Sequence, residues 1–260
     1  MTSYVHGHAA AVLRSHRWRT VENSAGYLLP HLRPGMSILD VGCGPGTITI
    51  DLAERVTPGR VVGVDPVGSV IAEATALGGT AEFLVGDVSA LDVADDTFDI
   101  VHAHQVLQHL GDPVAALREM RRVAKPGGII AARDADYAAM TWFPESRGIE
   151  DWLRIYRAVA RESGGEPDAG RRLAAWARDA DLEDVDATAG VWCFAAEADR
   201  VWWANLWADR MLESRVGERA VAGGHCTRGD LARIATAWRE WAAEPAGWFS
   251  VLHGEIVCRA

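Results

Sequence analysis

The feature that most constrains the fold is a glycine-rich turn between a short apolar strand and a helix. The apolar run over residues 36–42 predicts a buried strand, and a helical pattern begins at Gly46. Gly42, Gly44 and Gly46 stand between the two elements, where glycine lets the backbone approach a ligand closely. The third glycine comes one residue too early for the dinucleotide-binding pattern. The order of strand, turn and helix predicts the first unit of a nucleotide-type α/β fold.

Strands and helices alternate from residue 36 to residue 134. Strand patterns cover residues 36–42, 60–65, 81–87, 98–104 and 129–134. Helical patterns between them cover residues 46–56, 67–77 and 113–124, the last opened by Asp112 as N-cap and Pro113 in the first turn. Alternation of this kind predicts a parallel sheet with helices on both faces.

The pattern changes after residue 134. Helical segments are predicted within residues 137–181 and 198–243, and strands over residues 183–195 and 247–260. The total is a Rossmann-like α/β sheet of seven strands, with helical insertions after the fifth and sixth strands. Before the sheet, residues 1–35 have a helical pattern in which Thr20 caps a helix that runs to Leu32.

Composition excludes several classes of protein. The net charge of −10 opposes binding to a phosphate backbone, so nucleic acid is not an expected partner. No apolar run reaches the roughly 18 residues that a membrane span needs, and the N-terminus lacks the order of a signal peptide. The four cysteines are widely spaced, and the histidines form no HExxH pattern. These features predict a cytoplasmic protein without a metal site or disulfides, acting as a monomer or homodimer.

Three acidic residues accompany the predicted strands on the side of the glycine turn. Asp40 precedes the turn, Asp65 ends the second strand and Asp87 ends the third. An acid in the place of Asp65 accepts hydrogen bonds from ribose hydroxyls in nucleotide-binding folds. The carboxylate of Asp87 is placed to accept from an adenine amino group.

Five motifs in register extend this pattern. LDVGCGPGT, VVGVD, FLVGD, FDIVHAHQVLQHL and RVAKPGG follow one another in this order. Together they resemble the class I S-adenosylmethionine-dependent methyltransferases, in the UbiE-like and type 11 branch. The resemblance is strong over residues 36–134. It implies an enzyme of EC 2.1.1 that binds S-adenosylmethionine, methylates a small molecule and releases S-adenosylhomocysteine.

The resemblance also implies roles for the glycine turn and for the acids around it. Gly42 and Gly44 let the turn pass beneath the methionine part of the cofactor. Asp40 either orders the turn or reaches the cofactor's amino group through water. Asp65 is implied to hold the ribose, and Asp87 with the backbone of Val88 to hold the adenine.

His104 and Gln105 follow the fourth strand and are implied to lie at the boundary between cofactor and acceptor. The unperturbed pKa of histidine lies near neutrality, so His104 is one candidate for the catalytic base. Asp134 is the other, because it ends the fifth strand at the same sheet edge, with Asp136 shortly after it. Tyr137 is a candidate wall or hydrogen-bond donor to the substrate. The alternative for each acid is a helix cap or a surface carboxylate.

In this branch the N-terminal segment folds over the cofactor as a lid, which implies a lid over residues 1–35 and a methyltransferase domain over 36–260. Arg17 is suited to meet a carboxylate and Trp18 to cover the sulfonium. Helix surface and core packing are the alternative for each lid residue. The side chains in this segment that are suited to substrate contact are Tyr4, His6, His8, Arg17 and Trp18.

The insertions at about 137–181 and 198–243 are the expected substrate caps. Core packing is the default for any single tryptophan. As a group, however, Trp142 and the other tryptophans after residue 134 suggest an aromatic-walled acceptor pocket. The N-terminal segment is also similar to thiol methyltransferases that cap the dithiols of gliotoxin-like and holomycin-like metabolites. That similarity implies S-methylation in secondary metabolism. O- or C-methylation of a phenol, quinol or polyketide stays open, and so does a non-catalytic cofactor-binding protein.

Overall fold

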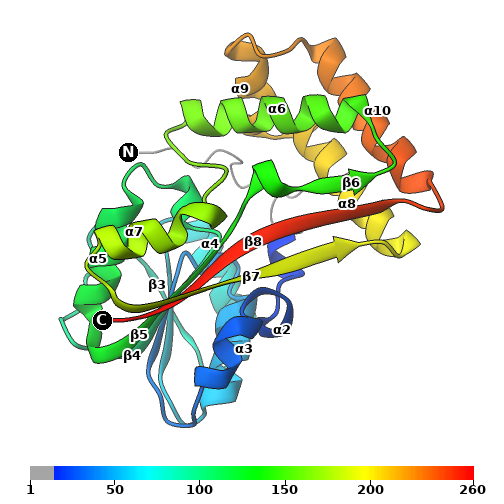
Figure 1. Ribbon diagram of the computed structural model, residues 1–260. Coiled ribbons are helices and arrows are strands. Elements are labelled where there is room, and N and C mark those ends of the chain that lie inside the picture. Colours follow the sequence, from blue (N-terminus) through cyan, green and yellow to red (C-terminus); the bar gives the residue numbers. More distant parts are fainter. Residues whose placement is uncertain (1–14) are drawn as a thin grey trace.

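A computed structural model describes residues 15–260 and shows one mixed sheet (Figure 1). The strand order is β3-β2-β1-β4-β5-β8-β6, and β7 pairs with β8. Strands β1 to β5 are parallel, whereas β8 runs antiparallel to β5, β6 and β7. The strands are β1 (Ile38–Val41), β2 (Val61–Asp65), β3 (Glu82–Val85), β4 (Phe98–His104), β5 (Ala124–Ala135), β6 (Thr141–Phe143), β7 (Glu183–Phe194) and β8 (Trp248–Arg259).

Helices cover both faces of the sheet. On one face, Leu117 of α5 and Leu173 of α7 pack on the strands, and on the other Leu28 and Leu52 pack on them. The α-helices are α2 (Val21–Ser24), α3 (Thr47–Val56), α4 (Gly68–Ala76), α5 (Pro113–Val123), α6 (Arg147–Glu162), α7 (Leu173–Asp179), α8 (Glu197–Glu213), α9 (Arg215–Ala222) and α10 (Arg228–Ala243). Short 3-10 helices are η1 (Gly26–His31), η2 (Leu107–His109), η3 (Tyr137–Ala139) and η4 (Gly170–Arg172).

The predicted fold is confirmed, with two differences in detail. A short additional strand, β6, pairs with the start of β8, and three residues are too few for a sequence pattern to reveal. The predicted helix from Thr20 to Leu32 is instead α2 followed by η1, which contains Pro30. Proline inside a helix removes a backbone donor, so a continuous α-helix is not formed there. Thr20 is the N-cap of α2, as predicted, in a capping box with Asn23.

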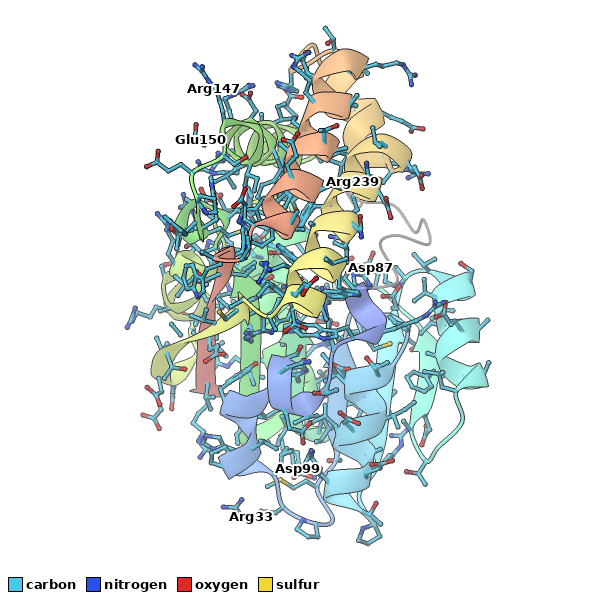
Figure 2. All side chains as sticks on the ribbon, turned by 90° about the vertical axis from the view of Figure 1, so that its right-hand side faces the viewer. Arg33, Asp87, Asp99, Arg147, Glu150 and Arg239 are labelled. Atoms are coloured by element: carbon cyan, nitrogen blue, oxygen red, sulfur yellow. The ribbon has the colours of Figure 1, made fainter. Side chains whose placement is uncertain are left out.

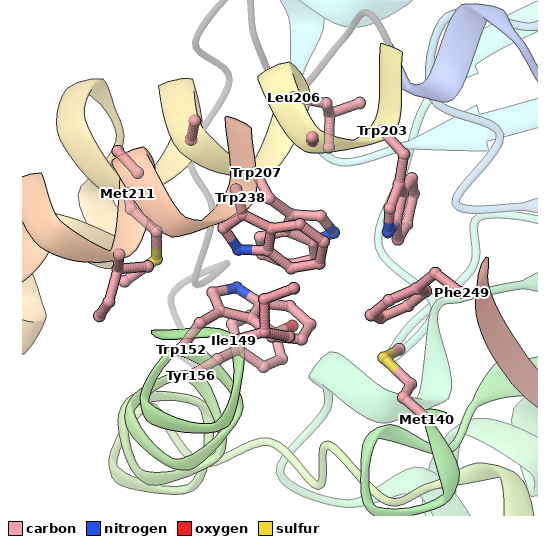
Figure 3. Close-up of a cluster of buried hydrophobic side chains, with 14 of the residues drawn as sticks. Met140, Ile149, Trp152, Tyr156, Trp203, Leu206, Trp207, Met211, Trp238 and Phe249 are labelled. Carbon is pink, nitrogen blue, oxygen red and sulfur yellow. The ribbon is translucent and has the colours of Figure 1, made fainter. Parts of the chain in front are cut away.

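The helical insertions follow β5 and β7, and their helices α6, α8, α9 and α10 gather at one end of the sheet (Figure 1). We call these four helices the cap. The centre of the cap is a cluster of buried aromatic rings (Figure 3). Trp152 lies 4.5 Å from Trp207 and 5.0 Å from Trp238 between ring centres, and all three side chains are fully buried. The tryptophans of the cap therefore form its core. No helix within residues 15–260 is long and apolar enough to span a membrane.

Candidate functional site

A cavity of about 730 Å³ opens at the carboxyl ends of the parallel strands. Its volume lies within the roughly 300–1,000 Å³ of small-molecule sites. The lining combines the glycine turn, the ends of β2 and β4, the loop after β3 and side chains from both insertions. The residues that the sequence analysis placed in the site and that line this cavity are Asp40, Gly42, Gly44, Asp65, Asp87, Val88, His104, Gln105 and Tyr137.

The glycine turn has a backbone that other residues adopt at a cost. Gly42, Gly44 and Gly46 have φ values of +65°, +56° and +85°. At Gly42 a Cβ atom would lie 2.4 Å from Cγ2 of Val106, so a side chain is excluded by contact as well as by conformation. The turn therefore presents bare backbone to the cavity, as the cradle for a bound cofactor requires.

Asp40 holds the turn from beneath. Its side chain is buried and accepts a 2.6 Å hydrogen bond from the Thr49 hydroxyl. The other carboxylate oxygen lies 2.8 Å from Nδ1 of His102, the residue opposite it on β4. These contacts take both oxygens of Asp40. Of the two roles that the resemblance implied for Asp40, the geometry favours ordering the turn.

Asp65 and Asp87 present carboxylates along one side of the cavity. Asp65 accepts hydrogen bonds from the backbone N–H of Gly44 at 3.3 Å and of Val67 at 3.0 Å. Asp87 accepts from the backbone N–H and the hydroxyl of Ser89 at 2.9 and 2.8 Å. Figure 2 shows Asp87 at the level where the cap meets the sheet. Both carboxylates are oriented by backbone donors and line the cavity, where a carboxylate can accept hydrogen bonds from the hydroxyl and amino groups of a nucleoside.

His104 presents a neutral imidazole to the cavity. The residue is 5% exposed, and neither ring nitrogen has a hydrogen-bond partner. Burial lowers the pKa of His104 well below 6.5, and the positive charges of Arg19 and Arg133 lower it further. Its neighbour Gln105 has a φ of +55°, an unfavourable value for a residue with a side chain. The Gln105 side chain accepts a 2.6 Å hydrogen bond from Arg19 and lies 2.9 Å from Nε2 of His253.

Several residues of the lining were not predicted from the sequence. Arg19 lies two residues after Arg17, and the sequence carries no signal for which arginine faces inward. Arg210 is one charged residue among several on α8, and its burial depends on packing against the rest of the cap. The remaining polar residues missed are His16, Gln108 and His109.

Three predicted substrate contacts lie outside the cavity. Arg17 is exposed and pairs with Glu73 at 2.7 Å. Trp18 packs against Trp192 with ring centres 5.1 Å apart, and Trp142 stacks on Phe249 at 5.8 Å. Within residues 15–260 no tryptophan lines this cavity, because most of these rings pack in the core of the cap. The aromatic-walled acceptor pocket stays a prediction. Tyr4, His6 and His8 lie outside the described residues.

Asp134 and Asp136 are structural acids in this arrangement. Asp134 is fully buried and accepts a 3.1 Å hydrogen bond from the backbone N–H of Gln108, beneath the loop that follows β4. Burial raises the pKa of Asp134 to about 7, but its carboxylate does not line the cavity. Asp136 forms a two-pronged ion pair with Arg171 at 2.5 and 2.6 Å. Neither acid is therefore placed to take a proton from an acceptor.

No group of three or more histidine, cysteine or acidic side chains within residues 15–260 could hold a metal ion. The chemistry of the donors fits S-adenosylmethionine instead. Bare backbone, two carboxylates and a cavity of this size can take the methionine, ribose and adenine parts together. His104, Tyr137 and Arg210 also line the cavity.

Comparisons with known proteins agree with this geometry. A family model described as "Methyltransferase domain" matches residues 32–187. An uncharacterized methyltransferase of Schizosaccharomyces pombe is 37% identical over 267 residues, which cover 98% of this chain and 95% of that protein. A demethylmenaquinone methyltransferase of Staphylococcus aureus is 34% identical over 118 residues, 44% of this chain and 49% of that protein. The solved YcgJ protein of Bacillus subtilis has the same fold, with a TM-score of 0.56 at 17% identity over 90% of this chain and 98% of its own.

The family model covers more than half of the chain, and the S. pombe relative is similar along nearly the whole of it. The glycine turn, Asp65 and Asp87 lie within the matched residues and line one cavity. The chain therefore belongs to the class I S-adenosylmethionine-dependent methyltransferases, has UbiE-like homologues and is an enzyme of EC 2.1.1.

Proposed function

We propose that the enzyme methylates the thiol sulfur of a small molecule, such as a reduced dithiol of secondary metabolism. The observation that carries the proposal is the neutral, buried His104 at the acceptor end of the cavity. An imidazole whose pKa is lowered is a weak base and removes protons poorly from a phenol with a pKa of about 10. A thiol with a pKa of about 8.5 is partly ionised near neutral pH without a base.

The cofactor supplies an electrophilic methyl group when it is bound. The thiol proton leaves to water, and the thiolate electron pair forms the new sulfur–carbon bond. The old carbon–sulfur bond breaks, and its electrons stay on the departing sulfur. In this proposal His104 touches the acceptor: a neutral imidazole carries one N–H, which donates to the thiolate and aims it along the line of attack.

We assign the methionine carboxylate of the cofactor to Arg19, whereas the sequence had suggested Arg17 as the partner of a carboxylate. The Thr47 hydroxyl donates to the backbone carbonyl of His16 at 3.2 Å, so this segment lies along the glycine turn. Arg19 itself bonds Gln105 at the end of β4. A planar guanidinium at this place suits a carboxylate.

The same contacts support a lid at residues 1–35 and substrate caps at about 137–181 and 198–243. His16 and Arg19 come to the cavity from the first segment, Tyr137 from the second and Arg210 from the third. Each of the three segments therefore supplies at least one side chain to the cavity.

The test is a mass-spectrometric assay with S-adenosylmethionine and a panel of reduced dithiols, phenols and quinols, following release of S-adenosylhomocysteine. Methylation of the dithiols alone is the expected result. Methylation of phenols or quinols at a comparable rate would overturn the thiol assignment, as would no transfer to any thiol by protein that binds S-adenosylhomocysteine.

His104 is tested in the same assay. His104→Ala should lower kcat about 10- to 100-fold, the loss expected for a hydrogen bond to a charged group. His104→Gln, which keeps an N–H donor, should retain more activity. Equal activity of the alanine variant and the wild type would remove His104 from the reaction.

A further inference from the structure

We infer that His253 of β8 positions Arg19 for cofactor binding, and that it does so through the side chain of Gln105. The inference deepens the proposed function, because it rests on the proposed pairing of Arg19 with the methionine carboxylate. It does not depend on which atom of the acceptor receives the methyl group.

His253 is a buried residue outside the cavity. Its side chain is fully buried and does not line the cavity, whereas Gln105 and Arg19 both do. In the sheet it stands opposite Ala135 of β5 and Gly190 of β7. Because β8 is paired on both sides at this point, its backbone is a fixed support. His253 can act on a bound cofactor only through another side chain.

A chain of hydrogen bonds joins His253 to Arg19. Nδ1 of His253 lies 3.1 Å from the backbone carbonyl oxygen of Val251, and its Nε2 lies 2.9 Å from Nε2 of Gln105. Oε1 of Gln105 accepts a 2.6 Å hydrogen bond from Nη2 of Arg19. The chain therefore runs from the backbone of the last strand to the segment that precedes the sheet.

One arrangement of protons satisfies every bond of this chain. A guanidinium only donates, so the amide oxygen of Gln105 faces Arg19 and the amide NH2 group faces His253. A carbonyl oxygen only accepts, so Nδ1 of His253 carries a proton and donates it to Val251. Nε2 of His253 is then unprotonated and accepts from Gln105. The two ends of the chain require the same tautomer.

The surroundings keep His253 neutral, as this tautomer requires. Burial lowers the pKa of His253 well below 6.5, and the positive charges of Arg133 and Arg19 lower it further. The rings of His104 and Trp192 pack against it, with centres 6.2 and 4.3 Å away. A protonated ring would present a second donor to the amide NH2 group and lose this bond.

The chain also stabilises an unfavourable backbone conformation at Gln105. The φ of +55° costs free energy for a residue that has a side chain. The backbone N–H of Gln105 donates to the carbonyl oxygen of Arg133 at 2.7 Å, and its side chain is bonded at both ends. Without the bond to His253 the amide could rotate about its last torsion, and Arg19 would lose a fixed partner.

The experiment replaces the imidazole of His253 with two amides that differ in reach. The amide of His253→Gln can bring its oxygen near the place of Nε2, whereas the amide of His253→Asn reaches only the place of Nδ1. His253→Asn should raise the Kd for S-adenosylhomocysteine roughly 3- to 10-fold, as expected for one lost hydrogen bond. His253→Gln should stay closer to the wild type. Calorimetry gives the affinities, and thermal unfolding compares the stability of the two variants.

A double-mutant cycle with Gln105→Leu tests whether His253 acts through Gln105. His253→Asn should add little to the Kd of the Gln105→Leu enzyme, because the two residues belong to one hydrogen-bonded chain. Additive losses in the cycle would overturn the inference. Equal losses in His253→Asn and His253→Gln would overturn it as well, since a residue that only fills the core makes no such distinction.

Nitrogen NMR of the wild-type enzyme, with the ring of His253 assigned through its own backbone, keeps the inference testable if a variant fails to fold. The neutral ring protonated at Nδ1 is expected near neutral pH. A ring protonated at Nε2 would contradict the chain.

The Kd of Arg19→Gln separates this inference from the proposal on which it rests. An unchanged Kd would overturn the proposed role of Arg19 and the inference with it. A weaker affinity in Arg19→Gln together with additive losses in the cycle would overturn the inference alone.

Discussion

The two ends of the cavity are built in different ways. At the cofactor end, the site consists of the glycine turn and the acids that follow strands. The same residues also determine the local backbone there. At the acceptor end, the cap has a large tryptophan core, and within residues 15–260 Arg210 is the single residue of the four cap helices that lines the cavity. A sequence motif therefore locates the first end, whereas the second depends on how a whole set of helices packs.

A substitution in the core of the cap is expected to produce the largest difference between the two ends of the cavity. Trp152 is fully buried against Trp207 and Trp238, so Trp152→Ala should lower the free energy of unfolding by about 3–5 kcal/mol. Methyl transfer should fall more than affinity for S-adenosylhomocysteine. Urea unfolding and calorimetry check this expectation.

Trp248→Ala is the control, because Trp248 is 38% exposed and should cost far less. If Trp152→Ala weakens cofactor binding as much as it weakens turnover, the two ends are not separable in this way.

The corresponding change at the cofactor end is Asp65→Ala. Removing the acceptor of two ribose hydroxyls should cost roughly 1.5–3 kcal/mol of cofactor binding, or about 10- to 100-fold in Kd. The variant also loses the contacts to Gly44 and Val67, so thermal unfolding is measured beside calorimetry. An unchanged Kd would remove Asp65 from the cofactor site.

Acid should lower the free energy of unfolding, because three buried histidines are kept neutral in the folded protein. His104, His109 and His253 all have lowered pKa values, so the folded protein keeps them neutral below pH 6.5 while the unfolded chain takes up protons. Stability due to these histidines is lost as the pH falls. Asp134 acts in the opposite sense: its pKa is raised to about 7, so the folded state takes up a proton first and gains stability as the pH falls towards 4.

The sum of these effects is a loss of about 2 kcal/mol between pH 7.5 and pH 5.5, measured by urea unfolding at each pH. His109→Gln should reduce the loss by about 1 kcal/mol at pH 5.5, because one of the three histidines no longer titrates in the unfolded chain. A pH-independent stability would contradict the burial of these rings in neutral form.

The smallest effect is expected where the sequence analysis placed a lid contact. Arg17→Gln removes an exposed ion pair with Glu73, which should cost less than about 1 kcal/mol of stability. Cofactor binding and turnover should stay at the wild-type level, whereas Arg19→Gln should weaken cofactor binding. A large loss of turnover in Arg17→Gln would show that Arg17 contributes to the functional site.

The same comparison separates the features that the sequence predicts from those that depend on packing between distant segments. The turn at Gly42 and the acids at Asp65 and Asp87 follow from local chemistry, because a positive φ and a strand end determine what stands there. The inward position of Arg19 rather than Arg17 depends on how one short segment lies on the sheet. The burial of Trp152 and the exposure of Arg210 to the cavity depend on helices far apart in the chain, which no local pattern specifies.

The ladder between β7 and β8 has a mechanical consequence. Its pairing runs without a break from Asp186 opposite Val257 to Phe194 opposite Phe249, so the two strands extend from the sheet to the cap as one beam (Figure 1). The pairing has no irregularity along this length about which the two strands could bend. Bending the two strands apart along this length would break a row of backbone hydrogen bonds. Small molecules are therefore expected to enter and leave through shifts of individual segments around the cavity, with the two ends of the site kept at a fixed separation.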